Sequence, residues 1–272
     1  MIVWIASYPR SGNRLARATL RQAFGEERVC SAASAEALRQ DLAKPPLDEL
    51  QVGRDEDPLA RLRGLPEPVF VKTHNLPQEI HRLPHDEEGA APDRGRRWWP
   101  PWRRAKEFES SPAIYLVRDG RDSLVSHAHY LVDFNPKGYW TYAEVPNSAR
   151  FKSGGFEEAL WFLICSPGPY GGWSGNVAAW RRRRAPTAIV RFEDLIKDPI
   201  GTLAPAAADL GIELHARGQA PTFEELRARS ARPRLLRRGV AGSWRDEFPP
   251  EMLDEFWRRH GRQMRELGYP PD

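Results

Sequence analysis

Short apolar runs alternate with amphipathic stretches along this chain. Residues 2–6 form an apolar run that stops at a Ser-Tyr-Pro turn, and residues 13–24 then carry apolar side chains at helical spacing. Residues 69–74, 113–118 and 187–192 are further apolar runs of strand length, each flanked by turn or charged residues. Residues 250–267 have the pattern of a helix. The pattern therefore predicts strands that alternate with helices.

This alternation indicates a single α/β domain over residues 1–272, with a central, mostly parallel β-sheet flanked by helices. Ligands of such sheets bind outside the carboxyl ends of the strands, so the residues after each strand are the first candidates for a site.

Two regions break the alternation of strands and helices. Residues 83–112, with Pro, Gly and a WWPPWRR run, are expected to be a flexible insertion, and residues 134–175 an irregular wall around an apolar pocket.

The composition is that of a folded, globular protein, with 40% hydrophobic and 29% charged residues. No run of apolar residues is long enough to span a membrane, and the start of the sequence lacks the features of a signal peptide, so we expect a cytoplasmic protein without a membrane span. Cys30 and Cys165 lie far apart outside any CxxC pair. We expect both to be buried, unreactive thiols.

Arginine dominates the basic residues. Lysine and arginine total 41, and six of these are lysine, which leaves 35 arginines. Two explanations account for this bias equally well. One is genomic base composition, and the other is arginine's bidentate binding of phosphate and sulfate oxygens. The basic, aromatic-rich stretches 98–104 and 181–184 also raise the possibility of nucleic-acid or membrane binding. Because 37 acidic residues nearly balance the basic ones, we expect no nucleic-acid partner.

The first predicted strand runs into the loop Ser7 to Asn13, and a helix follows directly. Backbone N–H groups and a helix N-terminus at such a turn favour a bound anion. The loop is P-loop-like in position, but it lacks the leading Gly and the Lys after Gly12 that the GxxxxGK[ST] motif requires. A nucleotide-triphosphate-dependent kinase on a related scaffold is therefore the alternative, and it is disfavoured.

The same loop resembles the 5′-phosphosulfate loop of sulfotransferases that use 3′-phosphoadenosine 5′-phosphosulfate (PAPS), whose usual form is YPKSGTTW. Tyr8, Pro9, Ser11 and Gly12 match that form. Arginine stands at the family's lysine position, and Asn-Arg-Leu replaces Thr-Thr-Trp, so the stacking indole is absent. The resemblance implies that the phosphosulfate is bound by Arg10, Ser11, Gly12, Asn13 and Arg14.

The second long strand ends in VKTHNLP, which resembles the family's KTHLP segment with one inserted residue. The resemblance implies that His74 is the catalytic base and that Lys72 and Arg10 stabilise developing negative charge. A neutral imidazole is well suited to accept the proton of an acceptor hydroxyl. A lone histidine at a strand end is more often structural, so the catalytic interpretation depends on the neighbouring motifs.

Two later segments resemble the family's binding site for the 3′-phosphate of the nucleotide. Residues 118–126, RDGRDSLVS, resemble RDPRDVxxS, and residues 237–244, RRGVAGSW, resemble RKGxxGDW. The first match implies that Arg118 and Ser126 bind the phosphate, while the two residues at 121 and 122 brace the turn. The second implies the same phosphate-binding role for Arg237, Arg238 and Gly239.

Aromatic residues complete the resemblance. Phe223, in PTF, matches the family's TSF aromatic that stacks on adenine, and Phe192, in FED, matches its YED segment. Residues 170–180 resemble the family's GxWxxHvxxW segment beside the acceptor pocket, with Asn176 in place of the histidine. Without the resemblance, Phe192, Phe223 and Trp173 would be interpreted as core aromatics.

Five segments in the family's order, from residue 2 to about residue 260, imply an enzyme that transfers the sulfuryl group of PAPS to a hydroxyl or amine of a small-molecule acceptor. Adenosine 3′,5′-bisphosphate (PAP) would be the product. A sulfuryl group carries less negative charge than a phosphoryl group, so we expect no metal. The acceptor is not specified, and the oligomeric state stays open, because Pro249 and Pro250 replace part of the family's dimer motif.

Overall fold

The computed structural model describes residues 1–32, 35–53, 56–77, 111–134, 155–166, 168, 170–231 and 236–271. Most of the insertion expected at 83–112 and the first part of the wall expected at 134–175 lie outside the described residues. The elements of the fold lie in the described ranges.

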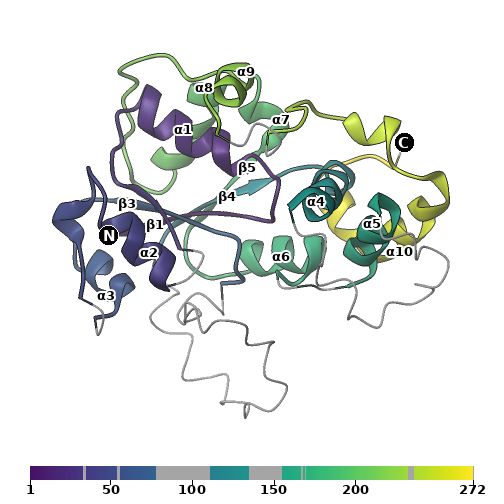
Figure 1. Cartoon of the computed structure of the whole chain (residues 1–272), viewed down its shortest axis with the longest axis horizontal. Coiled ribbons are helices and arrows are strands. Elements are labelled where there is room, and N and C mark those ends of the chain that lie inside the picture. Colours follow the sequence, from purple (N-terminus) through teal and green to yellow (C-terminus); the bar gives the residue numbers. More distant parts are fainter. Residues whose placement is uncertain are drawn as a thin grey trace, which may run out of the picture.

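A five-stranded parallel sheet forms the centre of the structure, in the order β2-β3-β1-β4-β5 (Figure 1). Its strands are β1 (Ile2–Ser7), β2 (Val29–Ser31), β3 (Val69–Thr73), β4 (Ala113–Val117) and β5 (Thr187–Arg191). The four strands predicted from apolar runs are confirmed. The prediction missed β2, because three residues at a sheet edge are too few to show a periodic pattern.

Helices cover both faces of the sheet, as the pattern predicted. On one face α1 (Asn13–Ala23) and α8 (Pro199–Ala208) pack against Val3 and Ile5 of β1. On the other, α4 (Gly120–Phe134), α5 (Phe156–Cys165), α6 (Gly172–Arg181) and α10 (Pro250–Glu266) share a core with Trp4 (Figure 1). Alternate residues of a strand point to opposite faces, so a strand between two layers is apolar throughout.

The remaining helices are shorter. They are α2 (Ala35–Leu42), α3 (Pro58–Arg63), α7 (Phe192–Leu195) and α9 (Phe223–Ala228), with 3₁₀ turns at Asp48–Leu50 and Ser243–Asp246. No helix in the described ranges is both long and apolar enough to cross a membrane. Cys30 and Cys165 are free and buried.

One expectation needs correction. The stretch 134–175 was expected to be irregular, yet α5 lies within it, and every residue of α5 from Ala159 to Cys165 is buried. A continuous apolar run carries no helical period, so the flanking glycines and prolines dominated the sequence pattern. The helix packs between α4 and α10 and contributes to the larger of the two cores.

The parallel arrangement brings the predicted motifs to one edge of the sheet. The loop after β1, the residues after β3 and those after β4 all follow carboxyl ends of adjacent strands. The helices α1 and α4 begin at this edge, where the predicted site residues that follow the strands also lie.

Candidate active site

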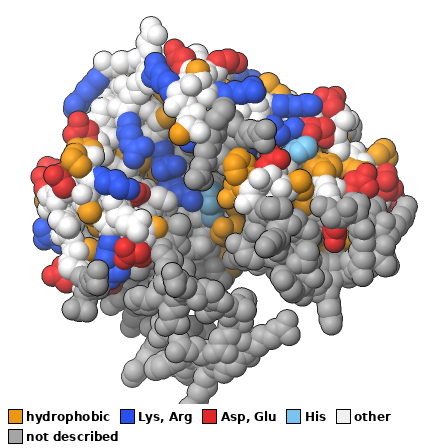
Figure 2. Space-filling model, viewed as in Figure 1, with side chains coloured by type: hydrophobic (Ala, Val, Ile, Leu, Met, Phe, Trp, Pro, Cys, Tyr) orange, Lys and Arg blue, Asp and Glu red, His pale blue; other side chains and the backbone are white. Residues whose placement is uncertain are grey.

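A cavity of about 440 Å³ lies at the carboxyl edge of the sheet. All of the predicted site residues except Ser11 line it. Basic side chains gather beside this hollow near the middle of the face in Figure 2. Segments that lie far apart in the sequence thus converge on one cavity, as the motifs predicted.

The loop after β1 has an unusual backbone. Gly12 has φ 97°, and a Cβ on it would lie 2.7 Å from the ring of Phe192, so only glycine fits. Arg10 also has a positive φ, 72°, a strained conformation that is typically found at functional loops. The side chain of Ser11 turns away from the cavity, with its Oγ 3.4 Å from the Oγ of Ser123.

Asn13 fixes this loop on the sheet. Its Nδ2 donates hydrogen bonds to the backbone oxygen of Ile5 at 3.0 Å and to the Oγ of Ser7 at 3.2 Å. The side-chain amide nitrogen is therefore committed to β1. Any contact of Asn13 with a bound anion would come from its backbone N–H, at the start of α1.

His74 follows β3 and is held in a defined tautomer. Its Nδ1 lies 2.8 Å from the backbone oxygen of Ser7, so Nδ1 carries the hydrogen and donates, which leaves Nε2 unprotonated. Burial first, and then the charge of Lys72, lowers the pKa of His74 well below its usual value. The ring is thus a neutral proton acceptor at physiological pH.

Lys72 precedes His74 on the same strand. Burial, followed by the nearby charge of Arg17, lowers the pKa of Lys72 to about 7. Its ammonium charge therefore depends on what else binds in the cavity, because an anion beside it favours the protonated form.

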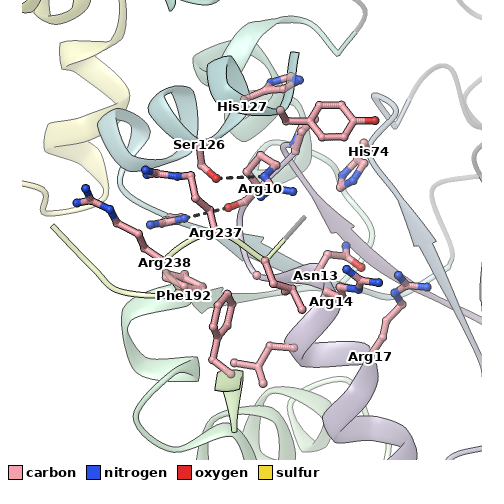
Figure 3. Close-up of a pocket in the computed structure, with 18 of the residues that line it drawn as sticks. Arg10, Asn13, Arg14, Arg17, His74, Ser126, His127, Phe192, Arg237 and Arg238 are labelled. Atoms are coloured by element: carbon pink, nitrogen blue, oxygen red, sulfur yellow. Dashed lines mark hydrogen bonds between the residues drawn. The ribbon is translucent and has the colours of Figure 1, made fainter. Parts of the chain in front are cut away.

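The predicted binding residues for the 3′-phosphate form one wall. Arg118 is 5% exposed, and it donates to the backbone oxygens of Arg10 at 3.3 Å and of Val240 at 2.9 Å. Ser126 accepts a hydrogen bond from Nε of Arg10 at 3.1 Å (Figure 3). Arg237 donates to Glu247 at 2.7 Å. This wall is thus assembled from the ends of β4, the first turns of α4 and the loop before residue 243.

Buried ion pairs brace that wall, as the sequence predicted for positions 121 and 122. The carboxylate of Asp122 accepts from the N–H of Gly242 at 2.7 Å, from the Oγ of Ser243 at 3.0 Å and from the N–H of Trp244 at 2.9 Å. Arg121 pairs with Asp119 at 2.7 Å. These contacts tie α4 to the loop that carries the second arginine motif.

The two predicted aromatic platforms differ in accessibility. Phe192 is 2% exposed, with the guanidinium carbon of Arg118 4.3 Å from its ring centre and Gly12 close to its edge. Phe223 is half-buried and packs against Gly239, where a Cβ would lie 2.3 Å from the ring. Phe223 is therefore free to stack on a ligand, while Phe192 mainly supports Arg118 and the loop.

The cavity also contains residues that the sequence did not single out, namely Arg17, His127, Tyr130 and Leu236. Tyr170, which begins the segment that resembles the family's acceptor-pocket segment, lines it as well. Arg17 lies three residues after Arg14 and so on the same face of α1, a spacing that could have revealed it. His127 has its Nδ1 3.1 Å from the hydroxyl of Tyr8, and burial lowers the pKa of His127 to about 3.

Asn176 supports the backbone next to His74. It is fully buried, and its Nδ2 donates to the backbone oxygens of His74 and of Tyr170, each at 3.0 Å. It stands where the family pattern has histidine, and here it links the backbone of His74 to that of Tyr170. Trp173, in contrast, is a fully buried core residue.

The described charged side chains that line this cavity are all of one sign. Its described lining contains seven Lys or Arg side chains and no Asp or Glu. A low-dielectric cleft of one sign attracts a ligand of opposite sign, in this case a polyanion. Within the described ranges, no group of three or more His, Cys, Asp or Glu residues is placed to bind a metal ion.

Comparison with curated proteins finds sulfotransferases. The chain is 28% identical to a 3-alpha-hydroxysteroid sulfotransferase of Cavia porcellus over 188 residues, which span 61% of this chain and 60% of that protein. It is 22% identical to sulfotransferase 1B1 of Mus musculus over 96% of this chain and 81% of that protein.

Solved structures share the fold. A mouse sulfotransferase, SULT7A1, complexed with PAP superposes with a TM-score of 0.60 at 20% identity, over 98% of this chain and 84% of that one. A retinol dehydratase in complex with androsterone and PAP gives a TM-score of 0.53 at 19% identity, over 97% and 81% of the two chains. The sulfotransferase domain family matches residues 106–268, more than half of the sequence. This chain therefore belongs to the sulfotransferase family.

Proposed function

We propose that this enzyme transfers the sulfuryl group of PAPS to a hydroxyl or amine of a small-molecule acceptor in the cytoplasm, without a metal ion. The observation that carries the proposal is the lining of the cavity, which combines, among the residues that the structure describes, seven cations, no carboxylate and a half-exposed aromatic ring. PAPS presents the matching groups, namely a 3′-phosphate, a 5′-phosphosulfate and an adenine ring.

The donor is oriented by the order of the strands. Arg118, Ser126, Arg237 and Arg238 would bind the 3′-phosphate beside β4, with Phe223 and Gly239 against the adenine. The backbone N–H groups of residues 11–14 and the side chain of Arg10 would bind the phosphosulfate at the start of α1. The sulfur atom then faces His74, which follows the neighbouring strand β3.

The reaction is an in-line displacement. The acceptor oxygen forms a bond to sulfur while the bond from sulfur to the bridging oxygen of the donor breaks, and PAP leaves with that bond pair. The acceptor proton passes to Nε2 of His74, the ring nitrogen that the Ser7 contact leaves unprotonated. Arg10 and Lys72 offset the charge that develops on the bridging oxygen.

The arginine at position 10 cannot act as a proton donor to the leaving group. Burial first, and then the neighbouring charge of Arg118, lowers the pKa of Arg10 to about 10, so the guanidinium stays charged near neutral pH. Arg10 therefore stabilises the leaving group electrostatically and does not donate a proton to it. The kinase alternative is not favoured, because the family match and the lining of the cavity both point to sulfuryl transfer.

Label transfer tests the proposal. PAPS that carries ³⁵S in its sulfuryl group is incubated with the protein and a panel of phenols, alcohols and amines, without metal. The labelled sulfated product and the unlabelled PAP are measured in the same reaction. We expect equal amounts of both, and a fall in kcat of about 10²- to 10⁴-fold in His74→Ala with little change in PAP affinity. Transfer of the γ-phosphate of ATP in Mg²⁺, with none from PAPS, would contradict the proposal.

A further inference from the structure

Six of the seven cations in the described lining of the cavity form two groups, and Arg10 belongs to neither. Arg118, Arg237 and Arg238 make up the first, next to β4. Arg14 and Arg17 of α1, with Lys72 of β3, make up the second, which we call the α1 group. In Figure 3 the guanidinium groups of Arg14 and Arg17 lie together, across the cavity from Arg237 and Arg238.

The order of the strands separates the two groups. Lys72 belongs to β3 and Arg118 follows β4, with β1 between them, which is a distance of about 10 Å at the usual strand spacing. The charge of Arg17 acts on Lys72 and on His74, whereas the cation that acts most on Arg118 is Arg237. The α1 group therefore lies on the side of His74, where the acceptor must bind, and away from the 3′-phosphate.

The two groups also differ in their partners. Arg237 and Arg238 form ion pairs with Glu247 and Asp246, at 2.7 and 2.9 Å. In the part of the chain that the structure describes, no member of the α1 group has a carboxylate within ion-pair distance.

Arg17 shows the imbalance most clearly. Its Nε is inaccessible to solvent and has no hydrogen-bond partner among the described residues. The same is true of the Nε atoms of Arg118 and Arg237, but each of these two arginines has a carboxylate within ion-pair distance, which Arg17 lacks in the described ranges. The acidic side chain that acts on it is Asp41, whose carboxylate accepts the N–H of Ser31 at 3.0 Å and lies 3.7 Å from Lys44. Arg21, on the next turn of α1, adds another positive charge beside Arg17. A shielded cation such as Arg17 without a counter-charge is costly, and a bound oxyanion removes that cost.

We propose that the acceptor of this sulfotransferase carries an oxyanion, such as a carboxylate or a phosphate, and that Arg17 and Arg14 bind it while His74 contacts the hydroxyl. The inference deepens the proposed function and rests on it. The donor's 3′-phosphate has its own cations in the first group, and its phosphosulfate has Arg10, Lys72 and the backbone N–H groups of the loop. The side chains of Arg14 and Arg17 are therefore available for the acceptor.

A matched pair of ligands tests this assignment. Binding of 4-hydroxybenzoate and of its neutral isostere 4-hydroxybenzamide is measured by calorimetry on protein saturated with PAP. We expect the carboxylate to bind about tenfold or more tightly than the amide, as a charged hydrogen bond in a shielded site predicts. Arg17→Gln should abolish this preference and leave PAP affinity unchanged, and Arg17→Lys should retain part of it. Arg262→Gln, which removes an exposed charge of α10, is the control and should change neither value.

The outcomes separate the two levels of the account. If PAP binds but the wild type does not prefer the carboxylate, or Arg17→Gln keeps the preference, the inference is wrong and the donor site stands. If 4-hydroxybenzoate competes with PAP, the anion occupies the donor site, which also overturns the inference. If PAP itself does not bind, the proposed function fails.

Discussion

The contacts of the Asp122 carboxylate predict how strongly the fold depends on the bracing of the 3′-phosphate wall. Asp122 is fully buried, accepts three hydrogen bonds from residues 242–244 and lies 3.6 Å from Arg118. In Asp122→Asn the amide keeps one oxygen acceptor, and its NH₂ group faces a backbone N–H in either orientation. At least one charge-assisted bond is lost, and Arg118 is left without its nearest carboxylate.

The magnitude follows from these losses. Removal of one partner of a buried ion pair costs about 3–5 kcal/mol in the free energy of unfolding. For a protein of this size, such a loss lowers Tm by roughly 10 °C. PAP affinity should fall as well, because residues 242–244 hold the loop that carries Arg237 and Arg238.

Urea and thermal unfolding provide the assay, with Asp246→Asn as the matched control. Asp246 is exposed and makes one ion pair, with Arg238, so its loss should cost about 0–1 kcal/mol. If the free energy of unfolding of Asp122→Asn lies within about 1 kcal/mol of the wild-type value, the carboxylate does not brace the wall and the reasoning is refuted.

Three further predictions concern the cavity. Arg118→Met should weaken PAP about 100-fold and 5′-AMP much less, since the 3′-phosphate is its proposed contact; an equal loss for both ligands in calorimetry would place that contact elsewhere. Gly239→Ala should weaken PAP about tenfold or more by displacing Phe223, whereas Gly211→Ala, with φ 75° and open space around it, should not; equal affinities would contradict the stacking assignment. Because the pKa of Lys72 is lowered to about 7, it is largely neutral at pH 8, and a bound anion raises that pKa, so PAP binding at pH 8 should take up protons. Calorimetry in two buffers of different ionisation enthalpy measures this uptake, which Lys72→Met should remove; an uptake that persists in the variant would assign it to another group.

Sequence and structure agree best where a predicted site residue directly follows a strand. Arg10, His74 and Arg118 each come within a few residues of a buried apolar run, and parallel strands bring such positions to one edge. The sequence therefore predicted the cavity's main residues before any geometry was known. The edge strand at Val29–Ser31 and the helix at Phe156–Cys165 were missed, because one is too short and the other too uniformly apolar for a periodic pattern.

Roles that depend on packing could not be predicted. Phe192 and Phe223 match family aromatics equally well, and only burial shows that Arg118 and Gly12 cover the first while the second is accessible. The commitment of the Asn13 amide to β1 is likewise a matter of distances. Local sequence identifies which residues reach a site, whereas their neighbours across the fold decide what each side chain does.

Titration of the wild-type protein with PAP, with 5′-AMP and with ATP in the presence of Mg²⁺ tests the central claim most directly. The account predicts micromolar binding of PAP without metal, a marked loss of affinity when the 3′-phosphate is missing, and weak binding of ATP, because the cavity's cations are proposed to bind a 3′-phosphate and a 5′-phosphosulfate. Absence of PAP binding, or a preference for ATP with Mg²⁺, would contradict the account and favour a kinase.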